Sequence, residues 1–441
     1  MRNDHDALQG VTPPTGARGA LSRRRVFLRL LSFVGPSAIA PWSLGMPSGS
    51  ARAATSATAS PVAPRVVTLH SGLVFPWGMD FLPDGRMLVT QKAGTMVILS
   101  ADGKSVLAAV DGLPPVMAEG MGGLLDVVID PEFARDPWVY WAYSEAGSGA
   151  EAGKAATSVA RGRLAGSTLR DVSVLFRQGP KVGGASHFGA RLAFRGDGTL
   201  FIALGDRKQL DPPGPTQGAE SLFRQFAKTA KQALTFGVPM LSPQSLATDL
   251  GKVVRINRDG TMPADNPKFD DADARPEIWS YGHRNPQGAA IHPDTGELWI
   301  VEHGPQGGDE LNRVLAGGNY GWPLKSYGCP YGSPVGEACR IGGGTHAPAY
   351  IEPVSHWVPI SIAPSGLMFY TGNRFPEWRG NAFIGALAGT ALWRVALSGN
   401  QEVSRERLFA DLGERIRCVR QGPDGWIYLL TGSGKLMRIE R

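Results

Sequence analysis

The stretch RGDGTLFIALGDR, residues 195–207, shows the pattern that decides the fold: a turn containing Asp and Gly, followed by a short apolar strand. The same unit recurs as LPDGRMLVTQ (82–91), HPDTGELWIVEHG (292–304) and GPDGWIYLLTG (422–432). Asp and Gly favour the tight turn, and the β-branched and aromatic residues that follow favour a strand. Each unit therefore predicts one turn and one strand.

The units are spread along the whole chain without a break in composition. One large closed β structure therefore fits better than two separate sandwiches. We predict an all-β fold, a six-bladed β-propeller, although four clear units do not define the number of blades and a multi-domain β protein is the alternative. The strand from Trp426 to Ile439 is expected to pair with the N-terminal strand near Val66.

Residues 211–246 depart from this pattern. The segment starts with the Pro-rich DPPGP, continues with the helix candidate SLFRQFAKTAKQAL and ends in VPMLSPQ. It predicts a partly helical lobe inserted on one face of the propeller. Such a lobe either shapes access to a central pocket or only decorates the surface.

The first 53 residues are typical of an export signal. The sequence SRRRVFLR (22–29) precedes an apolar run from Leu30 to Met46 and the small-residue site Ala51-Arg52-Ala53. Its paired arginines resemble the twin-arginine type of signal, which is used by proteins that cross the membrane already folded. Prolines and serines interrupt the run, whereas an uncleaved anchor needs about 18 continuous apolar residues. We predict a periplasmic protein without stable membrane insertion, with residues 54–441 as one propeller domain.

The charge of the chain depends strongly on this segment. Residues 1–53 hold seven Arg and two Asp, so that 38 of 45 basic and 37 of 39 acidic residues remain in the mature part. A nearly neutral domain lacks the basic surface that a nucleic-acid or anionic-membrane partner needs. We therefore expect no nucleic-acid partner.

The chain has three cysteines. In an oxidising compartment, Cys329 and Cys339 can close a short loop as a disulfide, but the sequence leaves this open. Cys418 lies between Ile416 and Val419 in an expected strand, where a buried, unreactive thiol is the simple interpretation. No Cys spacing typical of a metal site is present.

Polar residues of three kinds occur at the ends of expected strands. His187 lies in SHFGARLAF, Asp206 ends the next strand in LGDR, and Arg284-Asn285 lies in GHRNPQG. A lone His is usually structural, but a base, an acid and a fixed cation at equivalent positions indicate a site. The sequence alone does not show that they converge.

Eight fragments together resemble the soluble aldose sugar dehydrogenases that depend on pyrroloquinoline quinone (PQQ), of the glucose/sorbosone dehydrogenase-like family. They are, in order, HFGARLAF, ALGDR, GKVVRINRDG, SYGHRNPQG, EHGPQGGDELN, GGNYGWP, PSGLMFY and RIRCVRQGPDG. The resemblance covers most of residues 74–439. It implies a six-bladed propeller that holds PQQ and calcium and oxidises the C1 hydroxyl of an aldose to a lactone.

The resemblance implies roles for individual residues. His187 matches the base that takes the sugar proton, and Arg284 matches the cation that stabilises charge on the quinone oxygens. Cofactor-contact positions are matched by Asp206, Asn285, His303, Tyr331, Arg415 and Arg417. Arg415 and Arg417 are two residues apart on one strand, which suits the three carboxylates of PQQ.

Calcium is implied in two places. The carbonyl groups of Gly304 and Pro305 match the ligands of the ion beneath the quinone, where a hard cation acts as a Lewis acid. Glu310 and the backbone oxygen of Tyr320 match a second calcium site. Without the resemblance, Asp309 and Glu310 read equally well as turn residues.

Three positions depart from the family pattern. Met121, in EGMGGLLDV, stands where many members have Gln, Ala388 stands where some have Lys, and Cys418 replaces the Asp of RIRDVR. These side chains cannot replace the polar contacts of those groups. They either weaken the quinone site or change its properties.

Two other functions remain open. A calcium-dependent propeller lactonase would use a water on calcium and would not need Arg284, Arg415 and Arg417, and a non-enzymatic propeller would bind a sugar or a protein. The dehydrogenase needs an external electron acceptor. The sequence does not distinguish a monomer from a homodimer, and it identifies neither the sugar nor the acceptor.

Overall fold

The computed structural model of the chain describes residues 63–208 and 239–441. The predicted export signal, residues 1–53, lies outside the described residues, as does the helix candidate of the predicted insertion. The last residues of that insertion include a short 3-10 helix, Pro239–Gln244. No helix within the described ranges is long and apolar enough to cross a membrane.

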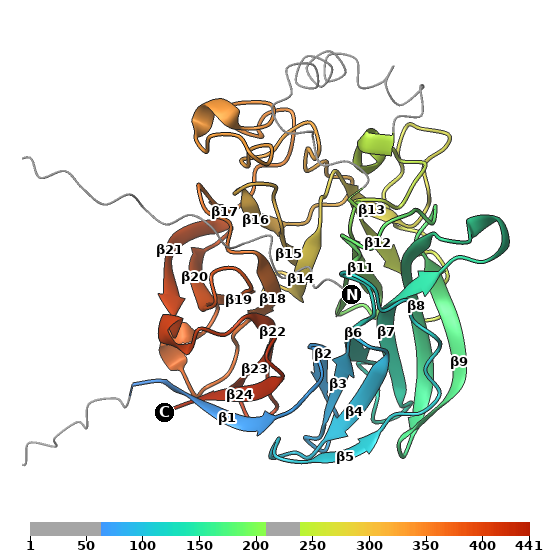
Figure 1. Cartoon of the computed structure of the whole chain (residues 1–441), viewed down its shortest axis with the longest axis vertical. Coiled ribbons are helices and arrows are strands. Elements are labelled where there is room, and N and C mark those ends of the chain that lie inside the picture. Colours follow the sequence, from blue (N-terminus) through green and yellow to red (C-terminus); the bar gives the residue numbers. More distant parts are fainter. Residues whose placement is uncertain (1–62, 209–238) are drawn as a thin grey trace, which may run out of the picture. The chain divides into compact units, whose positions relative to one another are not determined.

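The described residues form six four-stranded antiparallel sheets, which surround a central axis as the blades of a propeller (Figure 1). The prediction of a six-bladed all-β fold is thus confirmed. We number the blades in chain order from the first complete hairpin. All six lie in one compact unit, Pro61–Arg441.

The blades have the following strands. Blade 1 has β2 (Pro76–Phe81), β3 (Met87–Gln91), β4 (Thr95–Leu99) and β5 (Val106–Ala109). Blade 2 has β6 (Leu124–Ile129), β7 (Trp138–Ala146), β8 (Ala155–Ala165) and β9 (Thr168–Arg177). Blade 3 has β10 (Gly189–Phe194), β11 (Leu200–Leu204), β12 (Lys252–Ile256) and β13 (Ile278–Tyr281).

The second half of the ring is built in the same way. Blade 4 has β14 (Pro286–Ile291), β15 (Leu298–Glu302), β16 (Asp309–Arg313) and β17 (Ser355–Trp357). Blade 5 has β18 (Pro364–Phe369), β19 (Ala382–Ala386), β20 (Leu392–Ser398) and β21 (Gln401–Leu408). Blade 6 has β22 (Ile416–Gln421), β23 (Ile427–Thr431), β24 (Lys435–Glu440) and β1 (Arg65–Ser71). Short 3-10 helices also occur at Gly149–Glu151, Glu337–Cys339, Pro376–Trp378 and Ala410–Leu412.

Blade 6 closes the ring, because it combines strands from both ends of the described chain. Strand β1 pairs with β24, and Val66 lies opposite Ile439, as expected from the sequence. Closure of this kind joins the two ends of the described chain in one sheet.

The four turn–strand units of the sequence all form the same element, the second strand of a blade. They supply β3, β11, β15 and β23. The core lies between blades, since each of the six buried apolar clusters joins neighbouring blades. The first strand of each blade contacts the first strand of the next, so that β2, β6, β10, β14, β18 and β22 surround the axis.

Candidate functional site

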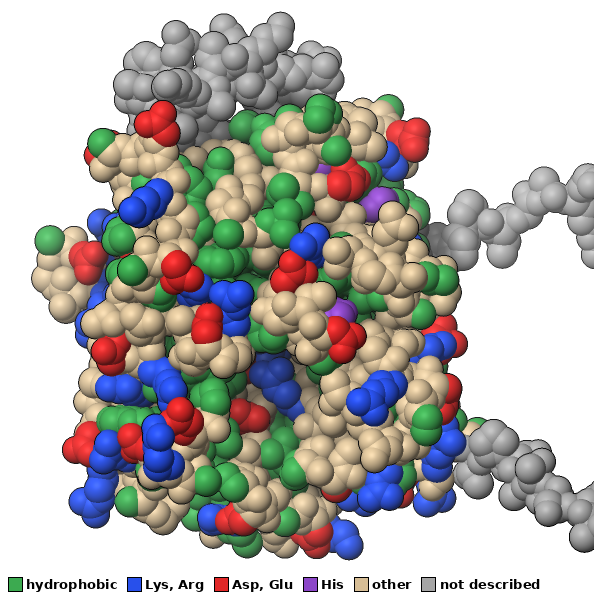
Figure 2. Space-filling model, turned by 180° about the vertical axis from the view of Figure 1, so that it is seen from behind, with side chains coloured by type: hydrophobic (Ala, Val, Ile, Leu, Met, Phe, Trp, Pro, Cys, Tyr) green, Lys and Arg blue, Asp and Glu red, His purple; other side chains and the backbone are tan. Residues whose placement is uncertain are grey.

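The loops that enter the innermost strands carry several of the predicted site residues. His187 lies two residues before β10, Asn285 directly before β14, and Arg415 directly before β22. Because these strands surround one axis, the loops meet at the same end of the propeller. Figure 2 shows a face that is hollowed near its centre, with a Lys or Arg side chain in the hollow.

His187 and Asp206 form a buried pair. His187 Nδ1 lies 2.7 Å from Asp206 Oδ1, and the other carboxylate oxygen accepts a 2.8 Å hydrogen bond from Trp322 Nε1. A carboxylate only accepts, so the proton of the neutral imidazole is on Nδ1 and Nε2 is the unprotonated nitrogen. The pair therefore provides an oriented base.

The backbone also holds the base in place. His187 has a φ of 49°, which is unusual for a residue other than glycine, and its carbonyl accepts a hydrogen bond of 3.2 Å from the Arg207 backbone. Left-handed conformations at such residues are often found where function requires a particular side-chain direction. Here the conformation directs the imidazole toward Asp206.

The pKa of Asp206 is below its ordinary value. Burial alone would raise this pKa, but the charge and the hydrogen bond of His187, with the charge of Arg284 and the Lys208 amide, outweigh burial. Asp206 is therefore ionised at neutral pH. Its carboxylate oxygens accept hydrogen bonds from Trp322 and from the Lys208 amide as well as from His187, so Asp206 orients the imidazole.

Arg284 links the base to the loop after β15. Its backbone carbonyl accepts a 2.8 Å bond from the Asp206 amide. Its guanidinium donates to the carbonyls of His303 (3.1 Å) and Gly304 (2.7 Å) and lies 5.1 Å from the centre of the Trp322 ring. A buried cation is thus fixed between His187 and Gly304.

Arg415 and Arg417 add positive charge from blade 6. Arg415 donates to the Leu387 carbonyl at 2.9 Å, and Arg417 donates to Gln287 Oε1 at 3.0 Å. Burial, with the charges of Arg191 and Arg415, lowers the pKa of Arg417 to about 9. Among the described residues, no acidic group pairs with Arg415 or Arg417. Arg415 is exposed and Arg417 is half-buried, so both cations are accessible to a ligand with several carboxylates.

Asn285 and His303 lie between these cations. Asn285 is fully buried, and its Nδ2 has no hydrogen-bond partner among the described residues. His303 donates from Nε2 to the Pro364 carbonyl at 2.8 Å, and burial lowers its pKa to about 3, so it is neutral at ordinary pH. Both residues offer polar atoms to a ligand.

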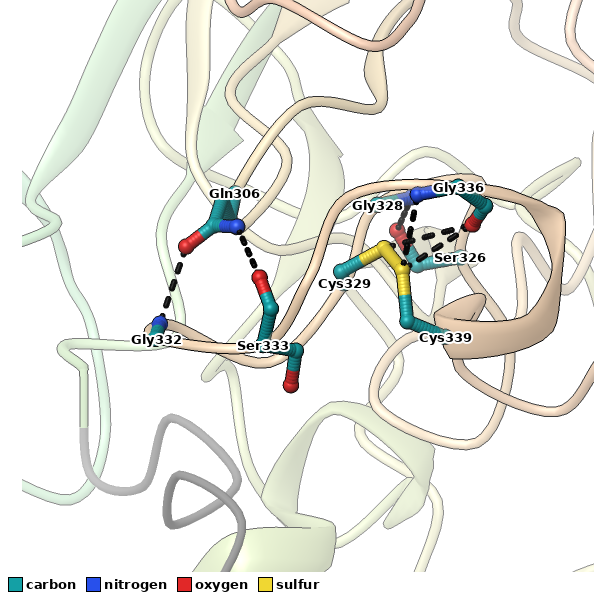
Figure 3. The surroundings of a disulfide bond; sticks show 8 residues. All are labelled: Gln306, Ser326, Gly328, Cys329, Gly332, Ser333, Gly336 and Cys339. Carbon is teal, nitrogen blue, oxygen red and sulfur yellow. Dashed lines mark hydrogen bonds between the residues drawn. A yellow bond between two sulfur atoms is a disulfide. The ribbon is translucent and has the colours of Figure 1, made fainter. Parts of the chain in front are cut away.

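Tyr331 lies in a loop closed by a disulfide between Cys329 and Cys339 (Figure 3). Gln306 also stabilises this loop. Its side chain accepts a hydrogen bond from the Gly332 amide at 2.9 Å and donates one to the Ser333 carbonyl at 2.7 Å. The Tyr331 side chain is about half exposed, at 49%. The loop is therefore fixed in position while its aromatic ring stays accessible to a ligand.

The residues predicted to bind metal lie around one small cavity. It is lined by Arg284, Glu302, His303, Gly304, Glu310 and Tyr320, among others. Asn312 Nδ2 donates to both Glu302 (3.0 Å) and Glu310 (3.1 Å), which brings the two buried carboxylates together. Pro305 is buried next to Gly304.

Charged side chains of both signs line this cavity, because Arg284 and Lys325 face it together with Glu302 and Glu310. Burial and the neighbouring Glu302 raise the pKa of Glu310 well above its ordinary value. His346 lies 3.4 Å from Glu310, but burial lowers the pKa of His346 to about 4, so it carries no charge at neutral pH. Residues 63–208 and 239–441 contain no cluster of three or more His, Cys, Asp or Glu side chains suited to a metal. A cation here would therefore also need backbone oxygens, which calcium accepts.

The three departures from the family pattern have different surroundings. Met121, 38% exposed, precedes β6, and Ala388 follows β19 in an exposed loop. Arg415 binds the carbonyl next to Ala388, so a cation remains at that position. Cys418 is buried on β22, as expected, among apolar residues of blades 1 and 6. Next to Met121, the Lys92 ammonium donates a hydrogen bond to the Gly120 carbonyl.

The sequence interpretation missed several residues that orient the site. Trp322 binds Asp206, Gln287 binds Arg417, and Arg191 donates from Nη2 to the Arg417 carbonyl at 2.8 Å. All three lie within fragments that carry the family resemblance, GGNYGWP, SYGHRNPQG and HFGARLAF. Their role depends on contacts between blades, which no local pattern indicates.

Comparisons with known proteins agree with this architecture. The sequence profile of the glucose/sorbosone dehydrogenase family matches residues 73–438. The chain is 41% identical over 388 residues to the aldose sugar dehydrogenase YliI of Escherichia coli, with 86% of this chain and 94% of that protein covered.

Solved structures show the same similarity. The apo form of the soluble aldose sugar dehydrogenase from Escherichia coli has a TM-score of 0.73 and 39% identity, covering 86% of this chain and 99% of that one. The PQQ-bound form of an aldose sugar dehydrogenase from Streptomyces coelicolor has a TM-score of 0.63 and 26% identity, with the same coverage. The chain therefore belongs to the glucose/sorbosone dehydrogenase family.

Proposed function

We propose that this protein is a PQQ-dependent aldose sugar dehydrogenase that oxidises the C1 hydroxyl of an aldose to a lactone. The single observation that supports this most strongly is the oriented His187–Asp206 pair together with the fixed guanidinium groups of Arg284 and Arg417. A base alone would also suit hydrolysis. The arginines indicate a ligand with several negative charges, as PQQ has.

The chemistry divides between the protein and its ligands. When bound, PQQ would supply the acceptor for the hydride, and calcium would supply a Lewis acid beside it. His187 Nε2 takes the proton of the C1 hydroxyl while the C1 hydrogen leaves as hydride, so that a C=O bond forms at C1. Asp206 keeps the proton of the imidazole on Nδ1 and stabilises the imidazolium.

The remaining site residues are proposed to bind and orient. Arg415, Arg417, Asn285, His303 and Tyr331 would contact PQQ, with Arg284 placed to stabilise charge on the quinone oxygens. Gly304 and Pro305 would bind the calcium beneath the quinone by their carbonyls, and Glu310 with the Tyr320 carbonyl would bind the second. We further propose export to the periplasm by the twin-arginine route and an external electron acceptor.

Reconstitution tests the proposed activity. The purified protein is incubated with PQQ and calcium, and aldose oxidation is followed with an artificial electron acceptor and by lactone formation. Lactone hydrolysis with calcium alone is assayed in parallel. We expect aldose oxidation that requires PQQ. Lactone hydrolysis without PQQ, and no aldose oxidation with it, would support the lactonase instead.

Calcium is expected to stabilise the protein without the quinone, because it would favour the ionised form of Glu310, whose pKa is raised by burial and by Glu302. Binding should raise the free energy of unfolding by about 2.7 kcal/mol at a free calcium concentration of about 100 times Kd. Glu310→Gln should lose most of this effect. Denaturant unfolding with calcium and with EGTA measures both. An undiminished calcium effect in Glu310→Gln would place the ion elsewhere.

The pH dependence of kcat/KM is expected to show one ionisation on its acid side. In the folded protein the pKa of Asp206 is below its ordinary value. The stability that its contacts provide is therefore fully present above the ordinary pKa, and it is lost only as the pH falls through the lower pKa of the folded state. Asp206 thus stays ionised from pH 5 to 8, while His187 must be neutral to accept a proton. On the acid side of the profile, the logarithm of kcat/KM should rise with pH with a slope of about one. A slope of two would show that a second group titrates.

A further inference from the structure

Gln287 contacts predicted quinone-binding residues from two parts of the fold, Asn285 before β14 and Arg417 on β22. It is on β14 and is 4% exposed. Its Oε1 accepts from Arg417 at 3.0 Å, and its Nε2 donates to Asn285 Oδ1 at 3.1 Å. Its backbone carbonyl accepts from Arg191 Nε at 2.6 Å. Through its side chain and its backbone, Gln287 thus joins residues of blades 3, 4 and 6.

The chemistry of these partners fixes the direction of both amides. A guanidinium can only donate, so the Gln287 oxygen must face Arg417 and its NH2 group must face Asn285. The Asn285 oxygen must then face Gln287, and its NH2 group is turned away. That nitrogen, Nδ2, is buried without a partner among the described residues, a condition that normally costs stability.

Gln287 also holds Arg417 without neutralising it. Arg417 is anchored at its carbonyl by Arg191, and both guanidinium groups lie over the Trp77 ring, at 4.0 Å for Arg191 and 5.7 Å for Arg417. A neutral oxygen at position 287 fixes the guanidinium in place but leaves its charge for a ligand. A carboxylate there would form an ion pair with it.

We propose that Gln287 is a positioning residue that locks Asn285 and Arg417 as donors toward the acceptor oxygens of an anionic ligand. The ligand class is a planar molecule with several carboxylates, and the inference rests on the proposed function in taking this ligand to be PQQ. Gln287 itself need not contact the ligand.

Two substitutions distinguish positioning from packing. Glu in place of Gln287 keeps the shape, but it pairs with Arg417 and accepts a hydrogen bond from Asn285, which turns the Asn285 oxygen toward the ligand. Met in place of Gln287 removes both hydrogen bonds and leaves the charge of Arg417. Gln287→Glu should therefore bind the ligand more weakly than Gln287→Met, while its Tm is equal or higher.

The experiment is a titration of the full-length protein with PQQ at fixed calcium, and separately with benzene-1,3,5-tricarboxylate as a carboxylate probe that is not a quinone. We expect Kd to rise at least about tenfold in Gln287→Glu for each ligand that binds, and less in Gln287→Met. In an Asn285→Ala background the effect of Gln287→Glu should shrink, because the two residues act together.

The outcomes separate this inference from the proposed function. Binding of the tricarboxylate but not of PQQ would overturn PQQ as the ligand while Gln287 is still tested on the probe. Binding of neither ligand to the wild type would overturn the inference. Unchanged affinity in Gln287→Glu, or equal losses in the Glu and Met variants, would also overturn it, since both would reduce Gln287 to a packing residue.

Discussion

Replacing His187 with Ala is expected to lower kcat by about 10²–10⁴-fold while PQQ still binds. The variant removes the nitrogen that accepts the C1 proton but leaves Arg284, Arg415 and Arg417 in place. The rate of quinone reduction by glucose, measured by stopped-flow absorbance, reports the chemical step, and a titration reports PQQ affinity.

Asp206→Asn is the matched variant for this first prediction. An amide at position 206 can donate to Nδ1, which moves the imidazole proton to Nε2 and removes the base without removing the ring. We expect a loss of kcat comparable to that of His187→Ala. If His187→Ala turned over normally, or if both variants lost only PQQ affinity, His187 would be a binding residue.

Replacing Arg284 with Met is expected to lower the rate of quinone reduction by about 10²–10³-fold. Arg284 is buried and held by two carbonyls, so its charge is fixed before the reaction and costs no reorganisation. Charge that develops on a quinone oxygen during reduction is stabilised most by such a group.

The control for Arg284→Met is Arg284→Lys, which keeps the charge but loses the planar fork of donors. We expect Arg284→Lys to retain a larger part of the rate than Arg284→Met. The measurement is single-turnover reduction at saturating PQQ and calcium. Weaker PQQ binding with an unchanged reduction rate in Arg284→Met would show that Arg284 binds the cofactor and does not assist the reaction.

The number of blades could not be read from the repeats because only four blades carry the repeated turn. In blade 2 the second strand, β7, follows the longer segment DPEFARDP, and in blade 5 β19 follows GNRFPEWRGN. Neither turn contains both Asp and Gly. The closing pair of β1 and β24 was predictable, since alternating strands lie at both ends of the described chain.

The sequence predicted which residues form the candidate site, but it did not predict the hydrogen bonds that hold them in place. His187, Asp206 and Arg284 occur in distinctive local sequences, and the structure brings them together. The contacts of Gln287 and Trp322 with residues about 115 to 130 positions away depend on how blades pack, so no local pattern predicts them. The sequence left the disulfide between Cys329 and Cys339 open, because its formation depends on the path of the loop that joins β16 to β17.

Anaerobic addition of one equivalent of glucose to the protein loaded with PQQ and calcium tests the central claim most directly. The account predicts that the absorption of the oxidised quinone is lost in the wild type with formation of one equivalent of the lactone, and that the spectrum of PQQ-bound His187→Ala stays unchanged on the same timescale. Bound quinone that no aldose reduces in the wild type would contradict the account.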